Sequence, residues 1–142
     1  MYKRQGCLLG VIFANVFFEH SLLELSNKNR DGLHIFVSEI VATFGLIFII
    51  FATLKDGKTI VAISVATYIS AGYWFTSSTS FANPAVSLAR TFTDSFTGIN
   101  YLNTPTYILA EFIGLILAAY ILRIIYKSVS YTHLTLPTNS RV

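Results

Sequence analysis

The residues whose types and spacing best suit a chemical role form one short stretch, Asn83-Pro84-Ala85-Val86, between long apolar segments. Asparagine is a favoured helix N-cap, and proline suits the first helical position because its missing N–H would have no partner there. The stretch therefore predicts the start of a helix. The side-chain amide of Asn83 can also donate a hydrogen bond to a water molecule or a hydroxyl group that passes it.

The other reactive side chains are too dispersed for catalysis. Glu39 and Glu111 lie in separate apolar segments, and neither has a histidine close to it in the sequence. The three histidines do not have the spacing of metal ligands, and the single cysteine cannot form an intrachain disulfide. We therefore expect a protein that is not an enzyme and that needs no cofactor and no metal.

The composition indicates a lipid environment. Hydrophobic residues make up 54% of the 142 residues and charged residues only 12%, whereas soluble domains carry about 25% charge. The net charge of +3 is modest and forms no basic stripe, so we expect the lipid bilayer, and not a nucleic acid, as the partner.

Apolar segments predict the helices that position the Asn-Pro-Ala stretch. The expected spans are 33–54, 59–75 and 106–122, preceded by 6–18, which is shorter than the roughly 20 residues that a span requires. We interpret 6–18 as a truncated span. Small residues recur every four positions, a spacing that allows close helix packing in a bilayer. They are Gly6, Gly10 and Ala14; Ala62, Ala66 and Ser70; and Ala110, Gly114 and Ala118.

The two ends differ from the rest of the chain. Residues 1–5 and the tail 129–142 lack apolar periodicity, and both resemble translated sequencing-adapter read-through. We therefore expect these ends to be non-native or disordered, and we expect the chain to be a fragment with native sequence missing upstream.

The region between the second and third spans is too short and mixed to cross a bilayer. Residues 76–80 are small and polar, as in irregular backbone that lines a water-filled cavity, and 84–93 are predicted to be a short helix. The sequence thus predicts a re-entrant loop and a half-helix whose positive amino end repels cations but not neutral solutes. A capped helix at the membrane interface, without a pore, is the alternative.

Four features together resemble the second half of the aquaporin, or major intrinsic protein, family. They are "SEIVATFG" around Glu39, a span that ends in "YW", the "NPA" stretch, and "AEFIGLILAAY" in the last span. The resemblance covers residues 6 to about 126. It implies an all-α membrane protein, a partial aquaporin-like helical bundle with one re-entrant NPA half-helix. The first half of such a channel, with its own NPA, would be absent.

The resemblance also assigns roles to residues. Asn83, with Pro84 and Ala85, would line the pore, and Glu39 would accept hydrogen bonds from backbone amides of the re-entrant loop. Glu111 is left open between structural pairing and a pore role. Water-selective and glycerol-conducting members usually have arginine where this chain has Val86.

The selectivity filter implied by the resemblance is wide and weakly polar. The histidine expected of a water-selective member is replaced by Ala71, and Ser80 would be the third filter residue from this half. Arg90 follows Val86 by four residues and could partly replace the missing charge, but Asp94 lies one turn further along. We predict that Arg90 and Asp94 form a structural ion pair.

These features predict a passive channel for small uncharged solutes. The stretch from Asn83 to Asp94 resembles a bacterial subgroup found with arsenic-resistance genes, which implies glycerol-like polyols, metalloid hydroxides such as arsenous acid, and some water. A homotetramer in the bacterial inner membrane is implied for the full-length protein. The residues themselves predict a tight turn at 55–58, which contains an Asp-Gly pair, and the basic residues Lys55, Lys58, Arg123 and Lys127 favour the cytoplasmic side for this turn. The alternative is a non-conducting membrane anchor or assembly subunit.

Overall fold

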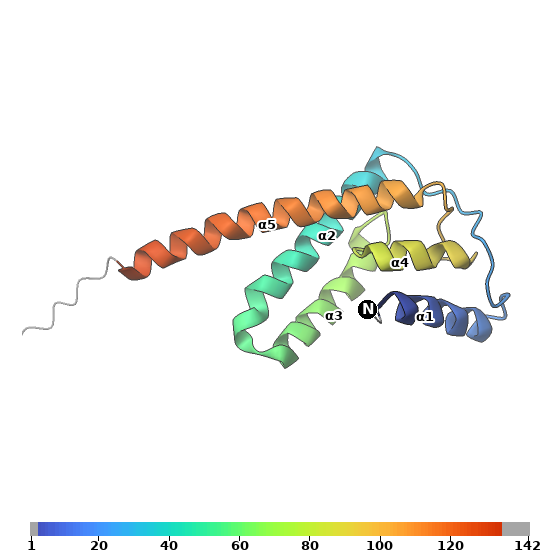
Figure 1. Ribbon diagram of the computed structural model, residues 1–142, viewed down its shortest axis with the longest axis horizontal. Helices are drawn as coiled ribbons and strands as arrows, with labels where there is room; N and C mark the ends of the chain where they lie inside the picture. The colour runs from blue at the N-terminus through green and yellow to red at the C-terminus, as the bar shows by residue number, and fades with distance from the viewer. Residues whose placement is uncertain (1–2, 135–142) are drawn as a thin grey trace, which may run out of the picture.

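The computed structural model describes residues 3–134, and their side chains from residue 5 to residue 126 (Figure 1). All regular structure in this part of the chain is helical, as the sequence predicts. The elements in chain order are α1 (Lys3–Phe17), α2 (Leu33–Thr53), η1 (Leu54–Asp56), α3 (Lys58–Phe75), α4 (Pro84–Ala89), η2 (Arg90–Phe92) and α5 (Thr104–Leu134).

Helices α2 and α3 form an antiparallel hairpin (Figure 1). Gly57 joins them at φ +96°, a conformation that glycine adopts without the steric cost of a side chain. The hydroxyl of Tyr68 lies 3.2 and 3.1 Å from the carbonyl oxygens of Val41 and Ala42, to which it donates. A Cβ at Gly45 would collide with this hydroxyl. The absence of a side chain there lets Tyr68 reach the α2 backbone.

Helix α5 packs along α2 in the most extensive contact of the fold (Figure 1). Ala42 of α2 and Ala110 and Ala118 of α5 are fully buried. A Cβ at Gly114 would lie 2.6 Å from the carbonyl oxygen of Ile40, so the two backbones approach closely. The small residues predicted to pack at this spacing do so on α5.

The other two small-residue stripes make no comparable contact in the described structure. A Cβ at Gly6 or Gly10 would have nothing within 4 Å, although α1 lies beside α4 (Figure 1). On α3, Ala62, Ala66 and Ser70 are exposed. The four-residue spacing therefore identifies a packed interface on one helix and unpacked faces on two.

Several element bounds differ from the sequence-based ones. The half-helix expected over 84–93 is α4 followed by the 3₁₀ turn η2, which ends at Phe92. We expected both ends to be non-native or disordered, but residues 3–5 belong to α1 and residues 129–134 continue α5, so these parts are helical. No glycine or proline interrupts the sequence between 115 and 134, so nothing stops the helix there. Residues 1–2 and 135–142 lie outside the described residues.

Two helical segments of the described residues are long and apolar enough to cross a membrane, Leu33–Asp56 and Thr104–Tyr126. A shorter apolar helix covers Gln5–Phe17, and the expected span in α3 is not among the two. Large apolar side chains remain exposed, with Trp74 at the end of α3 90% exposed and Phe17 at the end of α1 78% exposed. Apolar surface of this extent suits contact with lipid or with further helices.

Candidate functional site

The Asn-Pro-Ala stretch begins α4 in the way that its residue types predict. Asn83 has extended backbone angles, and its side-chain oxygen Oδ1 accepts a hydrogen bond from the amide of Ala85 at 2.9 Å. Pro84 occupies the first turn. The carbonyl oxygen of Asn83 accepts from the amides of Val86 and Ser87 at 2.9 and 3.0 Å. The two oxygens of Asn83 thus accept hydrogen bonds from the first three N–H groups of α4.

The capping bond also determines how the Asn83 amide can act. Because Oδ1 is committed to Ala85, the Nδ2 group is the free end of the side chain. It has no acceptor among the described residues, and Asn83 is exposed. The side chain therefore presents two N–H donors outward at the amino end of α4.

The loop that enters α4 has an unusual backbone. Thr79, Ser80 and Ala82 have φ values of 65°, 53° and 48°, in the left-handed region that residues with a side chain rarely adopt. Such a conformation persists only where its surroundings stabilise it. Here the surroundings are buried polar groups, among which Tyr107 of α5 donates from its hydroxyl to the carbonyl oxygen of Ser78 at 3.3 Å.

Glu39 of α2 is the main support of this loop. Its side chain is completely buried, and its carboxylate accepts hydrogen bonds from the backbone amides of Phe81, at 3.4 Å, and Ala82. A buried carboxylate needs such partners, and here the loop amides supply them. The amide face of the loop is thereby held against α2.

The carbonyl face of the same loop is not used by the protein. Among the described backbone groups and the side chains of residues 5–126, no group donates to the carbonyl oxygens of residues 79–82. An acceptor without a protein donor normally binds water or a ligand. These backbone oxygens, which directly precede Asn83 in the chain, are therefore left for water or a ligand.

Glu111 of α5 has a role that the sequence-based interpretation left open. It is buried, and its Oε1 accepts from the amide of Asn83 at 3.1 Å and from the hydroxyl of Ser87 at 2.6 Å. The signal in the sequence was an acid inside an apolar span, which requires a partner, together with Ser87 one turn after Asn83. Two carboxylates, on α2 and α5, thus hold the start of α4.

The residues proposed for the filter have different surroundings. Ser80 is buried against Gly72 of α3, where a Cβ would lie 2.6 Å from the Ser80 hydroxyl oxygen. Ala71, the neighbour of Gly72, is exposed. Val86 is half-buried and packs against the cluster of Phe81, Ile99 and Tyr107. The structure thus places Ser80 against Gly72 and leaves Ala71 exposed, and Val86 is only partly covered by the core cluster.

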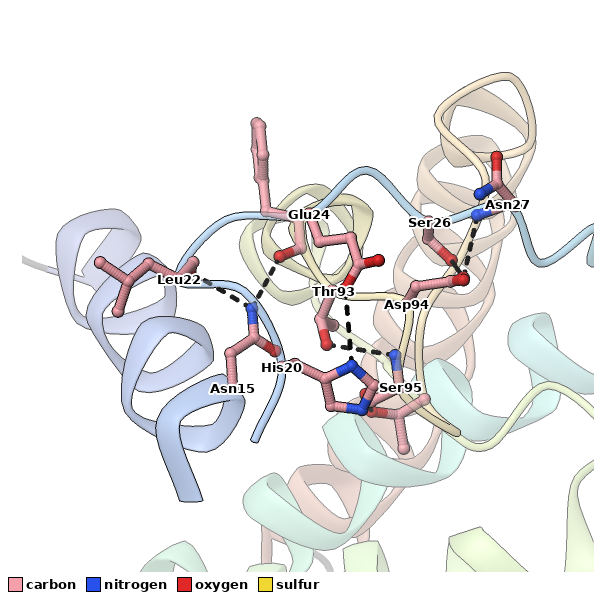
Figure 2. Close-up of polar contacts among 11 residues, drawn as sticks. Asn15, His20, Leu22, Glu24, Ser26, Asn27, Thr93, Asp94 and Ser95 are labelled. Atoms are coloured by element: carbon pink, nitrogen blue, oxygen red, sulfur yellow. Dashed lines mark hydrogen bonds and ion pairs between the residues drawn. The ribbon is translucent and has the colours of Figure 1, made fainter. Parts of the chain in front are cut away.

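The predicted ion pair between Arg90 and Asp94 is wrong. Asp94 instead accepts from the hydroxyl of Ser26 at 3.2 Å and from the amide of Asn27 at 3.0 Å, which fastens the 19–32 loop (Figure 2). Arg90 donates to the hydroxyl of Thr97. The helical spacing that would have paired the two residues is lost because the chain leaves the helix at Phe92, and Thr93 is extended.

Arg30 was overlooked at the sequence level because it lies in a polar loop. Its guanidinium donates to the carbonyl oxygens of Gly98, at 2.9 Å, and Phe96, at 2.6 Å, and it lies 3.5 Å from the hydroxyl of Thr79. A single side chain thus connects the 19–32 loop, the loop before α5 and the re-entrant loop. No local pattern in the sequence identifies such long-range contacts.

Within the described side chains, no group of three or more histidine, cysteine, aspartate or glutamate residues could hold a metal ion. His20 Nδ1 lies 3.5 Å from Glu24 Oε2, four residues later in the 19–32 loop. The polar groups of the candidate site are instead one exposed amide, a row of free carbonyl oxygens and two buried carboxylates. This set can exchange hydrogen bonds with a neutral solute.

The fold and the site together define the class of protein: an all-helical membrane protein with a loop and a short helix that enter the bundle without crossing it. Comparison with known proteins narrows the class. The chain is 42% identical over 118 residues to the aquaglyceroporin AqpS of Rhizobium meliloti (strain 1021), an alignment that covers 83% of this chain and 51% of the relative. No protein-family model and no solved structure matches the chain.

The chain therefore belongs to the aquaporin, or major intrinsic protein, family. It spans about half the length of the curated relative that it matches. The relative is named as a channel, which agrees with the expectation that this chain is not an enzyme.

Proposed function

We propose that this chain forms part of a passive membrane channel for small uncharged solutes. The observation that carries the proposal is the re-entrant unit, in which the Asn83 amide and the free carbonyl oxygens of residues 79–82 lie together at the start of α4. Irregular backbone at membrane depth is tolerated where it faces protein or water. The amide side of this loop faces Glu39. The carbonyl side is then the side that faces water.

The donors and acceptors of this unit suit a neutral hydroxylated solute. A solute that leaves water must replace the hydrogen bonds of its hydration shell, and the loop carbonyls together with the Asn83 N–H groups offer both kinds. Charged solutes gain much less, because the unit has no exposed counter-charge. The arrangement requires no chemical step, so transport follows the concentration gradient.

The proposed solutes follow from the filter. Val86, Ala71 and Ser80 are small, so the constriction is wide enough for glycerol-like polyols and for metalloid hydroxides such as arsenous acid, besides some water. The name of the relative includes glycerol, which supports the polyol part of the proposal. For the full-length protein we propose a homotetramer in the bacterial inner membrane.

The chain alone is proposed to be half of the pore. One re-entrant unit supplies one wall, and a second unit must face it to exclude lipid from the passage. The test is to place the 142-residue chain in liposomes, either alone or joined to the amino-terminal half of the relative, and to follow glycerol flux by light scattering. We expect flux only from the joined protein. Flux through the chain alone would show that copies of it assemble a pore by themselves.

A joined protein that inserts in the membrane but conducts none of these solutes would contradict the channel. The chain would then be better described as a non-conducting anchor or assembly subunit, whose exposed apolar helix faces serve contacts with other proteins. Insertion is checked by flotation with the liposomes, so that a failure to fold is not mistaken for a lack of conduction.

Val86→Arg in the joined protein is expected to decrease glycerol flux about tenfold or more while decreasing water flux less. A long cationic side chain narrows the constriction, and larger solutes lose more than water. The matched control is Val41→Arg, on an exposed position of α2. Equal glycerol flux in Val86→Arg and the unaltered protein would remove Val86 from the filter.

A further inference from the structure

A cavity of about 430 Å³ lies where the end of α1, the end of α4 and the loop before α5 meet. Its polar lining consists of Asn15, His20, Arg90, Ser95 and Thr97. None of the residues proposed to line the pore contributes to it, so it is a separate space. A cavity of this volume can hold a small organic ligand.

Asn15 supplies an acceptor that no described residue uses. The side chain is 1% exposed, and its Nδ2 donates to the carbonyl oxygens of Leu22, at 3.3 Å, and Phe92, at 3.1 Å (Figure 2). These two acceptors fix which end of the amide is nitrogen. The oxygen Oδ1 is left buried without a donor, on the side of the amide toward His20 (Figure 2). A buried acceptor of this kind normally has a partner.

Arg90 supplies a cation that no described carboxylate neutralises. The structure gives no ion pair to Arg90 within the described side chains, and Asp94 is occupied by the 19–32 loop. Its guanidinium contacts the hydroxyl of Thr97, lies 3.5 Å from that of Tyr73, and lies 6.0 Å from the centre of the Phe81 ring. Since guanidinium has five N–H donors, several remain for a ligand.

The two groups together restrict what the cavity can bind. Asn15 Oδ1 requires a donor, and Arg90 requires an acceptor. A fully deprotonated oxyanion such as a carboxylate only accepts and cannot satisfy Asn15, whereas an ammonium group only donates and is repelled by Arg90. A hydroxyl group does both, and the hydroxyls of Ser95 and Thr97 add further partners.

We propose that this cavity is a binding site for a small neutral polyhydroxylated solute, held by Arg90 and Asn15. The proposal goes beyond the pore because it assigns a second site to different residues. It requires binding at equilibrium and does not require conduction by this chain.

The test is a glycerol titration of the full 142-residue chain in lipid nanodiscs, followed by NMR of the side-chain N–H signals of asparagine and arginine. We expect a saturable shift with glycerol and no saturable shift with 1-propanol or acetate. Arg90→Gln is expected to weaken glycerol binding about tenfold, as for the loss of one charged hydrogen bond. Arg90→Lys is expected to restore part of that affinity. Arg123→Gln, on an exposed position of α5 away from the cavity, is the matched control and is expected to leave binding unchanged.

The proposal is overturned if glycerol shows no saturable shift, if 1-propanol or acetate shifts the same signals equally, or if Arg90→Gln binds glycerol as tightly as the unaltered chain. Circular dichroism checks that the variant keeps its helices. If the variant does not fold, the titrations of the unaltered chain with glycerol, 1-propanol and acetate still test the proposed site. Glycerol flux through the joined protein with no binding here would refute this site alone. Binding here with no flux would refute only the proposed channel.

Discussion

Two regions of this protein achieve close backbone contact by opposite means. Where α5 crosses α2, small apolar residues, Ala42, Ala110 and Gly114, leave room for the helices to touch, and no backbone–backbone hydrogen bond joins the two helices in the described residues. Where the re-entrant loop meets α2, the backbone has no helix to satisfy it. The Glu39 carboxylate must then take the place of the missing intrahelical acceptors.

The difference determines how each region responds to change. Apolar packing depends on volume, so the stability that a substitution costs there increases with the change in side-chain volume. The loop depends on a few hydrogen bonds in a buried setting, and the loss of one partner leaves polar groups unpaired at a high cost. A channel needs both: a scaffold that tolerates apolar variation, and a polar unit that is held in one conformation.

The largest expected effect comes from Glu39→Leu. The substitution leaves the buried amides of Phe81 and Ala82 without acceptors, and each such amide costs about 1–3 kcal/mol. We expect the free energy of unfolding to decrease by roughly 4 kcal/mol, measured by SDS titration in mixed micelles and followed by circular dichroism.

Glu39→Gln is the matched control for this prediction. It retains one side-chain oxygen of nearly the same position and is expected to lose less than half as much stability. Val37→Leu, at an exposed position two residues before Glu39 on α2, is the reference substitution. If Glu39→Leu is as stable as Val37→Leu, the carboxylate does not support the loop.

A smaller effect is expected in the apolar region. Gly114→Ala adds a Cβ that would lie 2.6 Å from the Ile40 carbonyl oxygen and 2.9 Å from Thr43 Cβ. We expect a loss of about 1–3 kcal/mol from this overpacking, measured by the same SDS titration.

Gly10→Ala sharpens the contrast, because its new Cβ has nothing within 4 Å. There the better helix propensity of alanine is expected to increase stability by up to about 1 kcal/mol. The same change on two helices should thus have opposite signs. A loss of stability in both variants would mean that the Gly10 face is also packed.

The scaffold could be predicted from the sequence because its signals are local. Apolar length identified α2 and α5, the Asp-Gly pair before Lys58 identified the hairpin turn, and Asn83 with Pro84 identified the start of α4. Spacing alone could not tell which small-residue stripe is packed, since Gly10 and Gly114 have the same local pattern. That distinction depends on which helices are neighbours.

The polar supports were predictable only in part. Glu39 and Glu111 were identifiable as buried acids, but only the fold shows that both hold the amino end of α4. The prediction for Arg90 and Asp94 failed because it assumed a helix that continues past Phe92. A chain that ends its helix early turns Asp94 toward the 19–32 loop instead. Local sequence patterns therefore do not predict long-range polar contacts.

The smallest expected effect concerns that loop. Asp94→Ala removes the acceptor for the Ser26 hydroxyl and the Asn27 amide, and because the site is only half-buried we expect a loss of about 1 kcal/mol. Hydrogen exchange should show the effect as faster exchange of the Asn27 amide. Asp31→Ala is the matched control, since Asp31 is exposed and bonds only to the nearby Asn29 side chain.

A double-mutant cycle tests which residue is the partner of Asp94. Ser26→Ala combined with Asp94→Ala is expected to show a coupling energy of about 0.5–1 kcal/mol, because the two residues share a hydrogen bond. Arg90→Gln combined with Asp94→Ala is expected to show a coupling near zero, because the two residues have different partners. The reverse pattern would restore the ion pair and would extend the polar support of the re-entrant unit to the end of its helix, so that α4 would be held by carboxylates at both ends.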